Sequence, residues 1–257
     1  MFLAIDLGNT NITMGLYSGD ALGPHWRLAA NHEKMPDEYG ALMLALLKRA
    51  GVDPAEIRDI AIASVVPPLT EIFQDACERC YRCKPLVVDG STHTGIRVLC
   101  DDAGQVGADR IVDAAACFKL YGGPACIVDF GTATTFDAIS AEGDFLGGAI
   151  APGIGIAAEA LFQRAAKLPK VEISRPPAAI GKNTVFSLQS GLLFGYVGLV
   201  EGLVARFRTE LGPATKVIAT GGLAETIATE TEMIAVVAPW LTLDGLRIIY
   251  NLNKPLN

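Results

Sequence analysis

The chain has 257 residues, 51% of them hydrophobic and 19% charged, which is enough apolar material for one large domain or two small ones and excludes a disordered chain. Its formal net charge of −7 argues against a general nucleic-acid or anionic-membrane surface, but not against a phosphorylated ligand, because backbone amides can hold phosphates. The start of the chain carries no basic targeting segment, and six cysteines in such a chain indicate free thiols in the reducing cytoplasm.

The first predicted element is a strand over residues 2–7, in which Asp6 stands among apolar side chains. A Gly8-Asn9-Thr10 turn follows, and residues 12–16 then alternate apolar and polar side chains, as a half-buried strand does. The segment therefore predicts a β-hairpin. Because an unpaired buried carboxylate is costly, we expect a compensating partner for Asp6.

Helices and buried strands alternate in the rest of the first half. Apolar residues at helical spacing, with Pro36 near the start and Gly51 past the end, predict the first helix. In chain order the pattern predicts a helix over 37–50, a strand over 59–66, a helix over 71–83, a short strand over 85–90 and a helix over 108–123.

The opening pattern returns at residues 125–147 as an apolar strand with one aspartate, a Gly-Thr turn and an alternating strand. Asp129 corresponds to Asp6 at an offset of 123 residues, and Gly143 corresponds to Gly19 at an offset of 124, so the copies differ by one inserted residue. An internal repeat near half the chain length predicts a duplicated domain.

The second half continues with predicted helices over about 155–165 and 184–209 and a strand over 216–222. The stretch near 185–205 is the most apolar, and we expect a buried helix there, with no membrane span and no membrane partner. No linker of low complexity separates the two copies. We therefore predict an N-terminal domain over 1–117 and a C-terminal domain over 118–257, each with one hairpin.

The paired hairpins are the strongest chemical signal. A turn of small residues presents successive backbone N–H groups that can hold a phosphate, and Thr10 or Thr132 can add a hydroxyl donor. The neighbouring Asp6 and Asp129 could hold metal ions, which would explain carboxylates on apolar strands. The alternative is that each aspartate merely caps a turn, and the repetition of the whole context argues against it.

A third carboxylate, Asp109, lies at the predicted start of the helix over 108–123. The helix dipole should keep it ionised and weakly basic, yet such a group can still orient a hydroxyl and take its proton late in phosphoryl transfer. A plain helix cap remains the alternative. The adjacent Arg110 could meet an anionic substrate or be an ordinary surface charge.

Three cysteines, Cys77, Cys80 and Cys83, form a C-x2-C-x2-C run, and Cys100 could supply a fourth thiolate. A metal or cluster site is disfavoured because the run lies in one predicted helix and the fourth ligand is distant. The glycine-rich segments 147–161 and 218–227 could line a binding site, although glycines alone are weak signals.

Seven segments of the chain form an ordered set that runs over essentially its whole length. They are "DLGNTNITMGL" (6–16), "SVVP" (64–67), "VGADRIVDA" (106–114), "DFGTATTFDAI" (129–139), "GGAIAPGI" (147–154), "NTVFSLQSGLLFGYVGLVEGL" (183–203) and "ATGGLA" (219–224). In content and order they resemble the type III pantothenate kinase family of the acetate and sugar kinase/heat-shock chaperone/actin superfamily. The combination of "GADR" with "DFGTA" is specific, whereas D-x-G-x-T alone would not be.

The resemblance implies an α/β fold of duplicated ribonuclease-H-like domains, with mixed sheets flanked by helices, ATP between the domains, and a homodimer. It implies the phosphorylation of pantothenate to 4′-phosphopantothenate, the first step of coenzyme A biosynthesis, with Asp109 as proton acceptor. Asp129 would hold a monovalent cation, K⁺ or NH₄⁺, and Asp6 would approach Mg²⁺ through water. Contacts to ATP are implied for Asp6, Leu7, Gly8, Asn9, Thr10, Asn11, Ile12, Thr13 and Thr132, and contacts to pantothenate for Cys100, Gly107, Ala108, Asp109, Arg110 and Thr184.

One position departs from the family pattern, because Cys100 stands where a tyrosine is common. Two further functions stay open. A nucleotide-binding regulator of transcription could keep the fold without the chemistry, but no basic recognition helix is visible and we expect no nucleic-acid partner. A related kinase of sugars or other small alcohols is the other alternative, because the residues alone predict only ATP-dependent phosphotransfer or ATPase activity.

Overall fold

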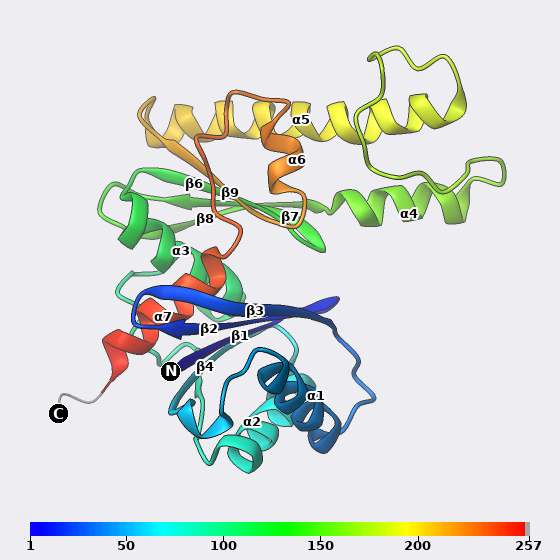
Figure 1. The fold of residues 1–257 in the computed structure, drawn as a ribbon. Coiled ribbons are helices and arrows are strands. Elements are labelled where there is room, and N and C mark those ends of the chain that lie inside the picture. The colour runs from blue at the N-terminus through cyan, green and yellow to red at the C-terminus, as the bar shows by residue number, and fades with distance from the viewer. Residues whose placement is uncertain (255–257) are drawn as a thin grey trace. The chain divides into compact units, whose positions relative to one another are not determined.

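The computed structural model describes residues 1–254, which form two five-stranded sheets flanked by helices (Figure 1). The strands are β1 (Phe2–Leu7), β2 (Asn11–Ser18), β3 (Ala21–Ala29), β4 (Asp59–Ser64), β5 (Leu86–Val87), β6 (Ala125–Phe130), β7 (Ala133–Ile139), β8 (Phe145–Pro152), β9 (Lys216–Gly221) and β10 (Val236–Val237). The helices are α1 (Pro36–Arg49), α2 (Pro67–Tyr81), α3 (Ala108–Tyr121), α4 (Ile154–Arg164), α5 (Thr184–Leu211), α6 (Ala224–Ala228) and α7 (Leu241–Asn253), with 3₁₀ turns at Pro54–Glu56 and Ala103–Gln105.

The two sheets repeat one topology. Their strand orders are β3-β2-β1-β4-β5 and β8-β7-β6-β9-β10. In each sheet the aspartate-bearing strand, β1 or β6, pairs antiparallel with the next strand in sequence and parallel with β4 or β9. The duplication predicted from the repeated pattern is therefore confirmed.

The copies differ in their turns. Four residues separate the paired residues Leu7 and Ile12, whereas three separate Phe130 and Thr134. The next turn is longer in the second copy, where Ser140–Asp144 joins β7 to β8. The single inserted residue inferred from the offsets is thus the net result of a shorter first turn and a longer second one.

Each aspartate-bearing strand divides its side chains between two faces, because successive residues of a strand point to opposite sides. Leu3, Ile5 and Leu7 pack into a core with α1 and α2, in which the rings of Tyr39 and Phe73 lie 4.6 Å apart. In the second sheet the corresponding core joins β6 to α5 and α6. Asp6 and Asp129 lie on the faces opposite these cores, and each is the one residue of its strand that is not buried.

The chain divides into two compact units. Among the described residues, the first holds 1–97, 101–116 and 241–254, and the second holds 98–100 and 117–240. This division differs from the predicted ranges 1–117 and 118–257 at the C-terminal end, because α7 packs against β1, β4 and β2 of the first unit. The sequence patterns did not predict α7 or β3.

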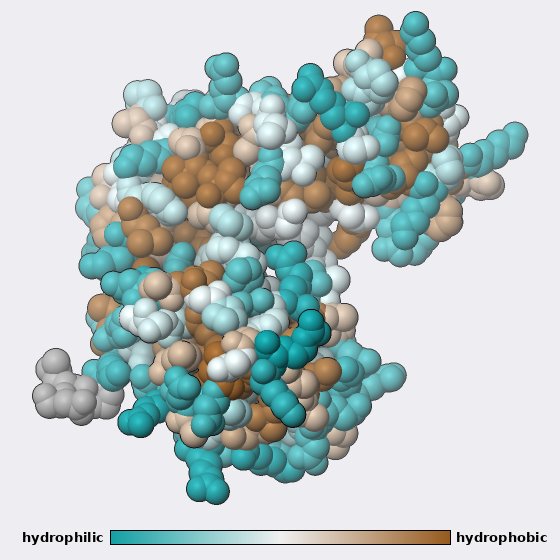
Figure 2. All heavy atoms as spheres, viewed as in Figure 1, coloured by the Kyte–Doolittle hydropathy of each residue, from teal (hydrophilic) through white to brown (hydrophobic). Residues whose placement is uncertain are grey.

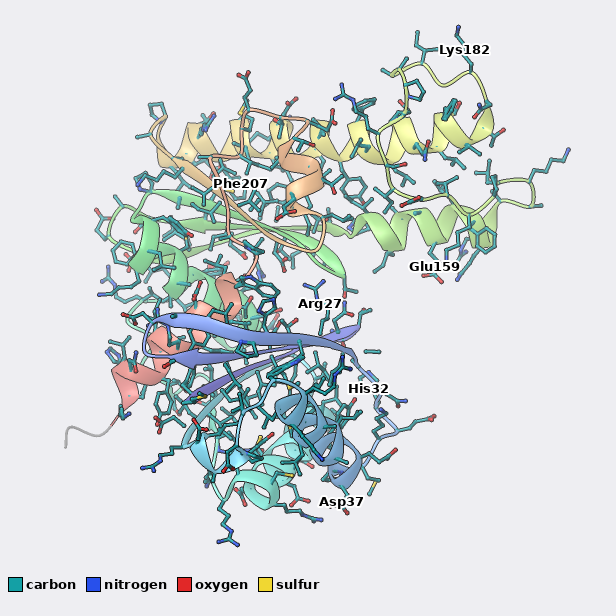
Figure 3. All side chains as sticks on the ribbon, viewed as in Figure 1. Arg27, His32, Asp37, Glu159, Lys182 and Phe207 are labelled. Atoms are coloured by element: carbon teal, nitrogen blue, oxygen red, sulfur yellow. The ribbon has the colours of Figure 1, made fainter. Side chains whose placement is uncertain are left out.

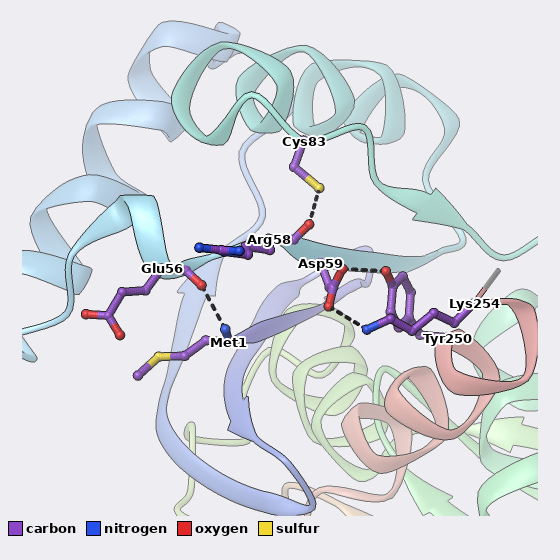
Figure 4. Close-up of polar contacts among 7 residues, drawn as sticks. All are labelled: Met1, Glu56, Arg58, Asp59, Cys83, Tyr250 and Lys254. Carbon is purple, nitrogen blue, oxygen red and sulfur yellow. Dashed lines mark hydrogen bonds and ion pairs between the residues drawn. The ribbon is translucent and has the colours of Figure 1, made fainter. Parts of the chain in front are cut away.

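Helix α7 is tied to the first sheet by polar contacts as well as by packing (Figure 4). The Tyr250 hydroxyl donates a 2.6 Å hydrogen bond to Asp59 Oδ1, and Lys254 Nζ lies 3.2 Å from Asp59 Oδ2. Burial alone would raise the pKa of Asp59, but these two contacts lower it below its ordinary value. The Tyr250 ring lies 5.0 Å from that of Phe2, which places α7 on the same face of β1 as Asp6.

Helix α5 is less buried than predicted. Among residues 1–254 it is the one helix long and apolar enough to cross a membrane by length and composition, and 28% of its most apolar window is buried. Core helices of folded proteins pass the same test, so the test does not assign a membrane span. Figure 2 shows hydrophobic side chains in several places on the surface of the second unit.

Candidate active site

The first hairpin places Asp6 beside a polar turn. Asp6 pairs with Thr13 on β2 and with Ala63 on β4, close to where the parallel strands β1 and β4 end. The Gly8 N–H donates to the Asn11 carbonyl at 3.0 Å and closes the turn, whose residues Asn9, Thr10 and Asn11 are exposed. The turn can therefore offer amide and hydroxyl groups to a phosphate next to a carboxylate.

The start of α3 lies at the same end of the first sheet. The Val65 N–H donates to the Leu7 carbonyl at 3.2 Å, directly after β4 ends. A Cβ on Gly107 would lie 3.2 Å from Val65 Cγ1 and 2.5 Å from Asp109 Oδ1. The fold therefore brings Gly107 and Asp109 to the hairpin end of β1, although about a hundred residues separate them in sequence.

Asp109 is the second residue of α3, and its Oδ1 accepts a 2.8 Å hydrogen bond from the Arg110 N–H. The Ile111 N–H donates to the Gly107 carbonyl, so the helical hydrogen bonds already begin at Gly107. Asp109 therefore lies inside the first turn and is not the N-cap residue that the alternative interpretation required. Burial raises the pKa of Asp109 and outweighs the N–H and charge of Arg110, which lower it. The predicted weak basicity is thus wrong: burial makes this carboxylate a stronger base than an exposed aspartate.

The second hairpin repeats the first. Asp129 pairs with Thr135 on β7 and Thr220 on β9, and Gly131 and Thr132 of the turn are exposed. The Gly153 N–H, at the start of α4, donates to the Thr132 carbonyl at 3.1 Å. A Cβ on Gly153 would lie 2.2 Å from that carbonyl oxygen, so only glycine lets the turn pack this closely.

The Asp129 carboxylate is bordered by two glycines. A Cβ on Gly131 would lie 3.3 Å from Asp129 Oδ2, and one on Gly221 would lie 2.4 Å from Asp129 Oδ1. Gly221 also has a φ of +88°, a conformation that favours glycine. In the sequence Gly221 is visible as part of a glycine pair, but only the parallel pairing of β9 with β6 shows that it borders Asp129.

Two predicted substrate contacts lie elsewhere in the second unit. Cys100 follows Leu99, whose N–H donates to the Phe145 carbonyl at 2.8 Å. Thr184 is the exposed first residue of α5, after the capping residue Asn183. Figure 3 shows Lys182, next to this helix start, at the same end of the unit as Glu159 on α4 and away from Phe207. The predicted substrate contacts are therefore divided between the units, with residues 107–110 in the first and Cys100 and Thr184 in the second.

The cysteine run does not form a metal site within residues 1–254. No group of three histidine, cysteine or acidic side chains there is arranged to hold a metal ion, and all six cysteines are free. Burial raises the pKa of Cys77, Cys80 and Cys83, which keeps them as thiols. Cys83 donates a hydrogen bond to the Arg58 carbonyl (Figure 4).

Comparison with known proteins gives both family and fold relatives. A family model described as type III pantothenate kinase matches residues 2–206. A type III pantothenate kinase of Roseiflexus sp. (strain RS-1) is 53% identical over 99% of this chain and 100% of its own length. One from Moorella thermoacetica is 51% identical over 98% of this chain and 100% of its own length.

Two solved structures share the fold at low sequence identity. A conserved Campylobacter jejuni protein named as a candidate Baf family transcriptional activator is 20% identical, covers 98% of each chain and has a TM-score of 0.63. A candidate 2-dehydro-3-deoxygalactonokinase from Sinorhizobium meliloti is 14% identical over 100% of this chain and 98% of its own, with a TM-score of 0.60. With the two matching sheets, this likeness confirms the predicted α/β fold of duplicated ribonuclease-H-like domains.

Proposed function

The chain belongs to the type III pantothenate kinase family, and from this premise we propose that it transfers the γ-phosphoryl group of ATP to the primary hydroxyl of pantothenate. The product, 4′-phosphopantothenate, enters coenzyme A biosynthesis. The observation that carries the proposal is the match of the family to the whole length of the chain, together with Asp109 beside the first hairpin.

Asp109 is the proposed proton acceptor. The pantothenate hydroxyl oxygen forms a bond to the γ-phosphorus, the bond from that phosphorus to the bridging oxygen of ADP breaks, and the hydroxyl proton passes to Asp109. Phosphoryl transfer depends mainly on positioning and charge neutralisation, so a carboxylate of raised pKa fixed at a helix start suits this role. ADP leaves with the electron pair of the broken bond.

The hairpin over residues 6–13 is the proposed phosphate-binding segment, with Thr132 of the second hairpin as a further ATP contact. Its exposed turn residues and the Asp6 carboxylate suit a nucleotide accompanied by Mg²⁺, which Asp6 would hold through water. Magnesium neutralises phosphate charge when bound. The substrate side would comprise residues 107–110, Cys100 and Thr184, with Arg110 available to the pantothenate carboxylate.

Asp129 is the proposed holder of a monovalent cation, potassium or ammonium. The residues around it fit such an ion: the carboxylate stands beside the exposed turn at Gly131, and its cross-strand partner Thr135 has a buried hydroxyl oxygen with no hydrogen-bond partner among the described residues. Hard cations take oxygen ligands of this kind. When bound, the ion would add positive charge near the phosphates.

A homodimer in the cytoplasm completes the proposal. Exposed apolar side chains on α4 and at the start of α5 would be covered by a second copy, and they include Ile156, Phe162 and Val185. The six free cysteines support a reducing compartment. A nucleic-acid or membrane partner is not part of the proposal, because the net charge is −7.

The test is turnover of pantothenate with ATP, Mg²⁺ and K⁺ by the wild-type protein and by Asp109→Asn. We expect the variant to lose at least about 100-fold in kcat, the lower end of general base contributions. Near-normal turnover by the variant would remove Asp109 from its role. A wild-type protein that binds ATP but phosphorylates no small alcohol would favour a regulator, and phosphorylation of a sugar in place of pantothenate would favour the related kinases.

A further inference from the structure

The repeat places a threonine directly across from each hairpin aspartate. Thr13 on β2 is the cross-strand partner of Asp6, and Thr135 on β7 is the cross-strand partner of Asp129. Directly opposed residues of an antiparallel pair lie on the same face of the sheet, with Cβ atoms about 5 Å apart. Thr13 falls within the proposed ATP-binding segment, whereas Thr135 is so far only a neighbour of Asp129 and is not among the residues proposed to bind a ligand.

The Thr135 hydroxyl oxygen is a candidate ligand for a cation. Its Oγ1 is buried and has no hydrogen-bond partner among residues 1–254. A buried hydroxyl left without a partner costs about 1–3 kcal/mol. A carboxylate and a hydroxyl oxygen on one face of two paired strands form part of an oxygen ligand set for a cation.

Strand β9 leaves room for this arrangement on the other side of Asp129. Gly221, the last residue of β9, has no side chain, and a Cβ there would lie 2.4 Å from Asp129 Oδ1. The carboxylate can therefore lie over the end of β9 with Thr135 on its β7 side. The first sheet differs at this point, because Ser64 ends β4 and its hydroxyl is bonded to Thr70 at 2.7 Å.

We propose that Thr135 Oγ1 is a ligand, together with the Asp129 carboxylate, of the monovalent cation. This inference rests on the proposed cation role of Asp129 and adds a residue to it. The ion would supply the contact that the buried Thr135 hydroxyl lacks, on the same face of the sheet as the Asp129 carboxylate.

The neighbouring Thr134 provides a matched control. Its hydroxyl is also buried and without a partner among the described residues, and its side chain is fully buried. It pairs with Phe130, which belongs to the core with α5, so Thr134 lies on the face opposite Asp129. Thr134→Val and Thr135→Val therefore remove the same group from the same strand on opposite faces.

The experiment measures the thermal midpoint of the full-length protein in potassium chloride and in choline chloride at equal ionic strength. We expect potassium to raise the midpoint of the wild type, Thr134→Val and Thr135→Ser. In Thr135→Val the half-saturating potassium concentration should rise at least about tenfold, because a contact to a charged partner is lost. In choline chloride both valine variants should melt at or above the wild-type midpoint, which shows that they fold.

Two results would overturn the inference and separate it from its premise. If Thr135→Val keeps the wild-type response to potassium while Asp129→Asn loses it, Thr135 is not a ligand but the cation role of Asp129 stands. If potassium stabilises neither the wild type nor Asp129→Asn relative to choline, the proposed cation site fails together with the inference, while pantothenate turnover still tests the kinase function.

Discussion

Asp109 shows how burial decides the chemistry of a single residue. Its position in the first turn of α3 would by itself favour the ionised form, because the helix dipole and the Arg110 N–H stabilise negative charge there. Burial acts in the opposite direction and is the larger effect, so the pKa is raised. The sequence predicts the position of this carboxylate, but its burial depends on packing between distant segments.

The raised pKa of Asp109 predicts an acid limit to activity. A proton acceptor must be deprotonated, so kcat/KM for pantothenate should fall as the pH drops through the pKa of Asp109, and this fall should lie above the ordinary aspartate value of about 3.9. The measurement is the pH profile of kcat/KM for the wild type. The residual rate of Asp109→Asn should lack this limb, and a limb that persists in that variant would assign the fall to another group.

At the scale of elements, the hairpins follow from sequence but their surroundings do not. Strands β1 and β6 are apolar except for one aspartate, and their partner strands alternate, so both hairpins are predictable. Strand β3 was missed because most of its residues are exposed and it contains Pro24, which breaks a strand pattern. It nevertheless pairs with β2 along most of its length at the edge of the sheet.

The packing of helix α7 should contribute to the stability of the first unit. Leu246 is fully buried on α7, which packs against the first sheet, so Leu246→Ala should lower the free energy of unfolding by about 2–5 kcal/mol. Leu252 on the same helix is 46% exposed, and Leu252→Ala should change it by less than about 0.5 kcal/mol. Urea unfolding of both variants measures the difference. Equal effects would show that α7 does not contribute to the first unit as its packing indicates.

At the scale of the whole molecule, the chain builds its two units from interleaved segments. The break falls within α3, between residues 116 and 117, and the chain returns to the first unit at Leu241. The second unit has exposed apolar side chains on α4 and at the start of α5. A monomeric protein seldom leaves such a surface uncovered.

That surface predicts the assembly state. If a second copy covers α4 and α5, Phe162→Asp places a charge in the interface and should convert a dimer into a monomer. Phe162 is 48% exposed within one chain, so the substitution should leave the fold intact. Leu120→Asp is the control, because Leu120 is 44% exposed but lies on α3. Sedimentation equilibrium gives the masses, and a wild-type monomer or a dimeric Phe162→Asp would contradict the proposal.

The sequence by itself determined the duplication, the two aspartate hairpins, most helices and strands, and the family resemblance. These features depend on residue order over short spans, where hydrophobic periodicity and turn residues act directly. The residues themselves made the two hairpins, Asp109 and Arg110 candidates for a site, and the resemblance added the other site residues and the substrate.

Only the tertiary structure decided which of these residues meet and how they are buried. It placed α7 with the first unit, set Gly221 against Asp129 and gave Asp109 a raised pKa. It also separated the two neighbouring threonines, so that Thr135 lies across from Asp129 and Thr134 faces the core. Contacts between segments far apart in the chain produce each of these features, and local patterns of residues carry no information about such contacts.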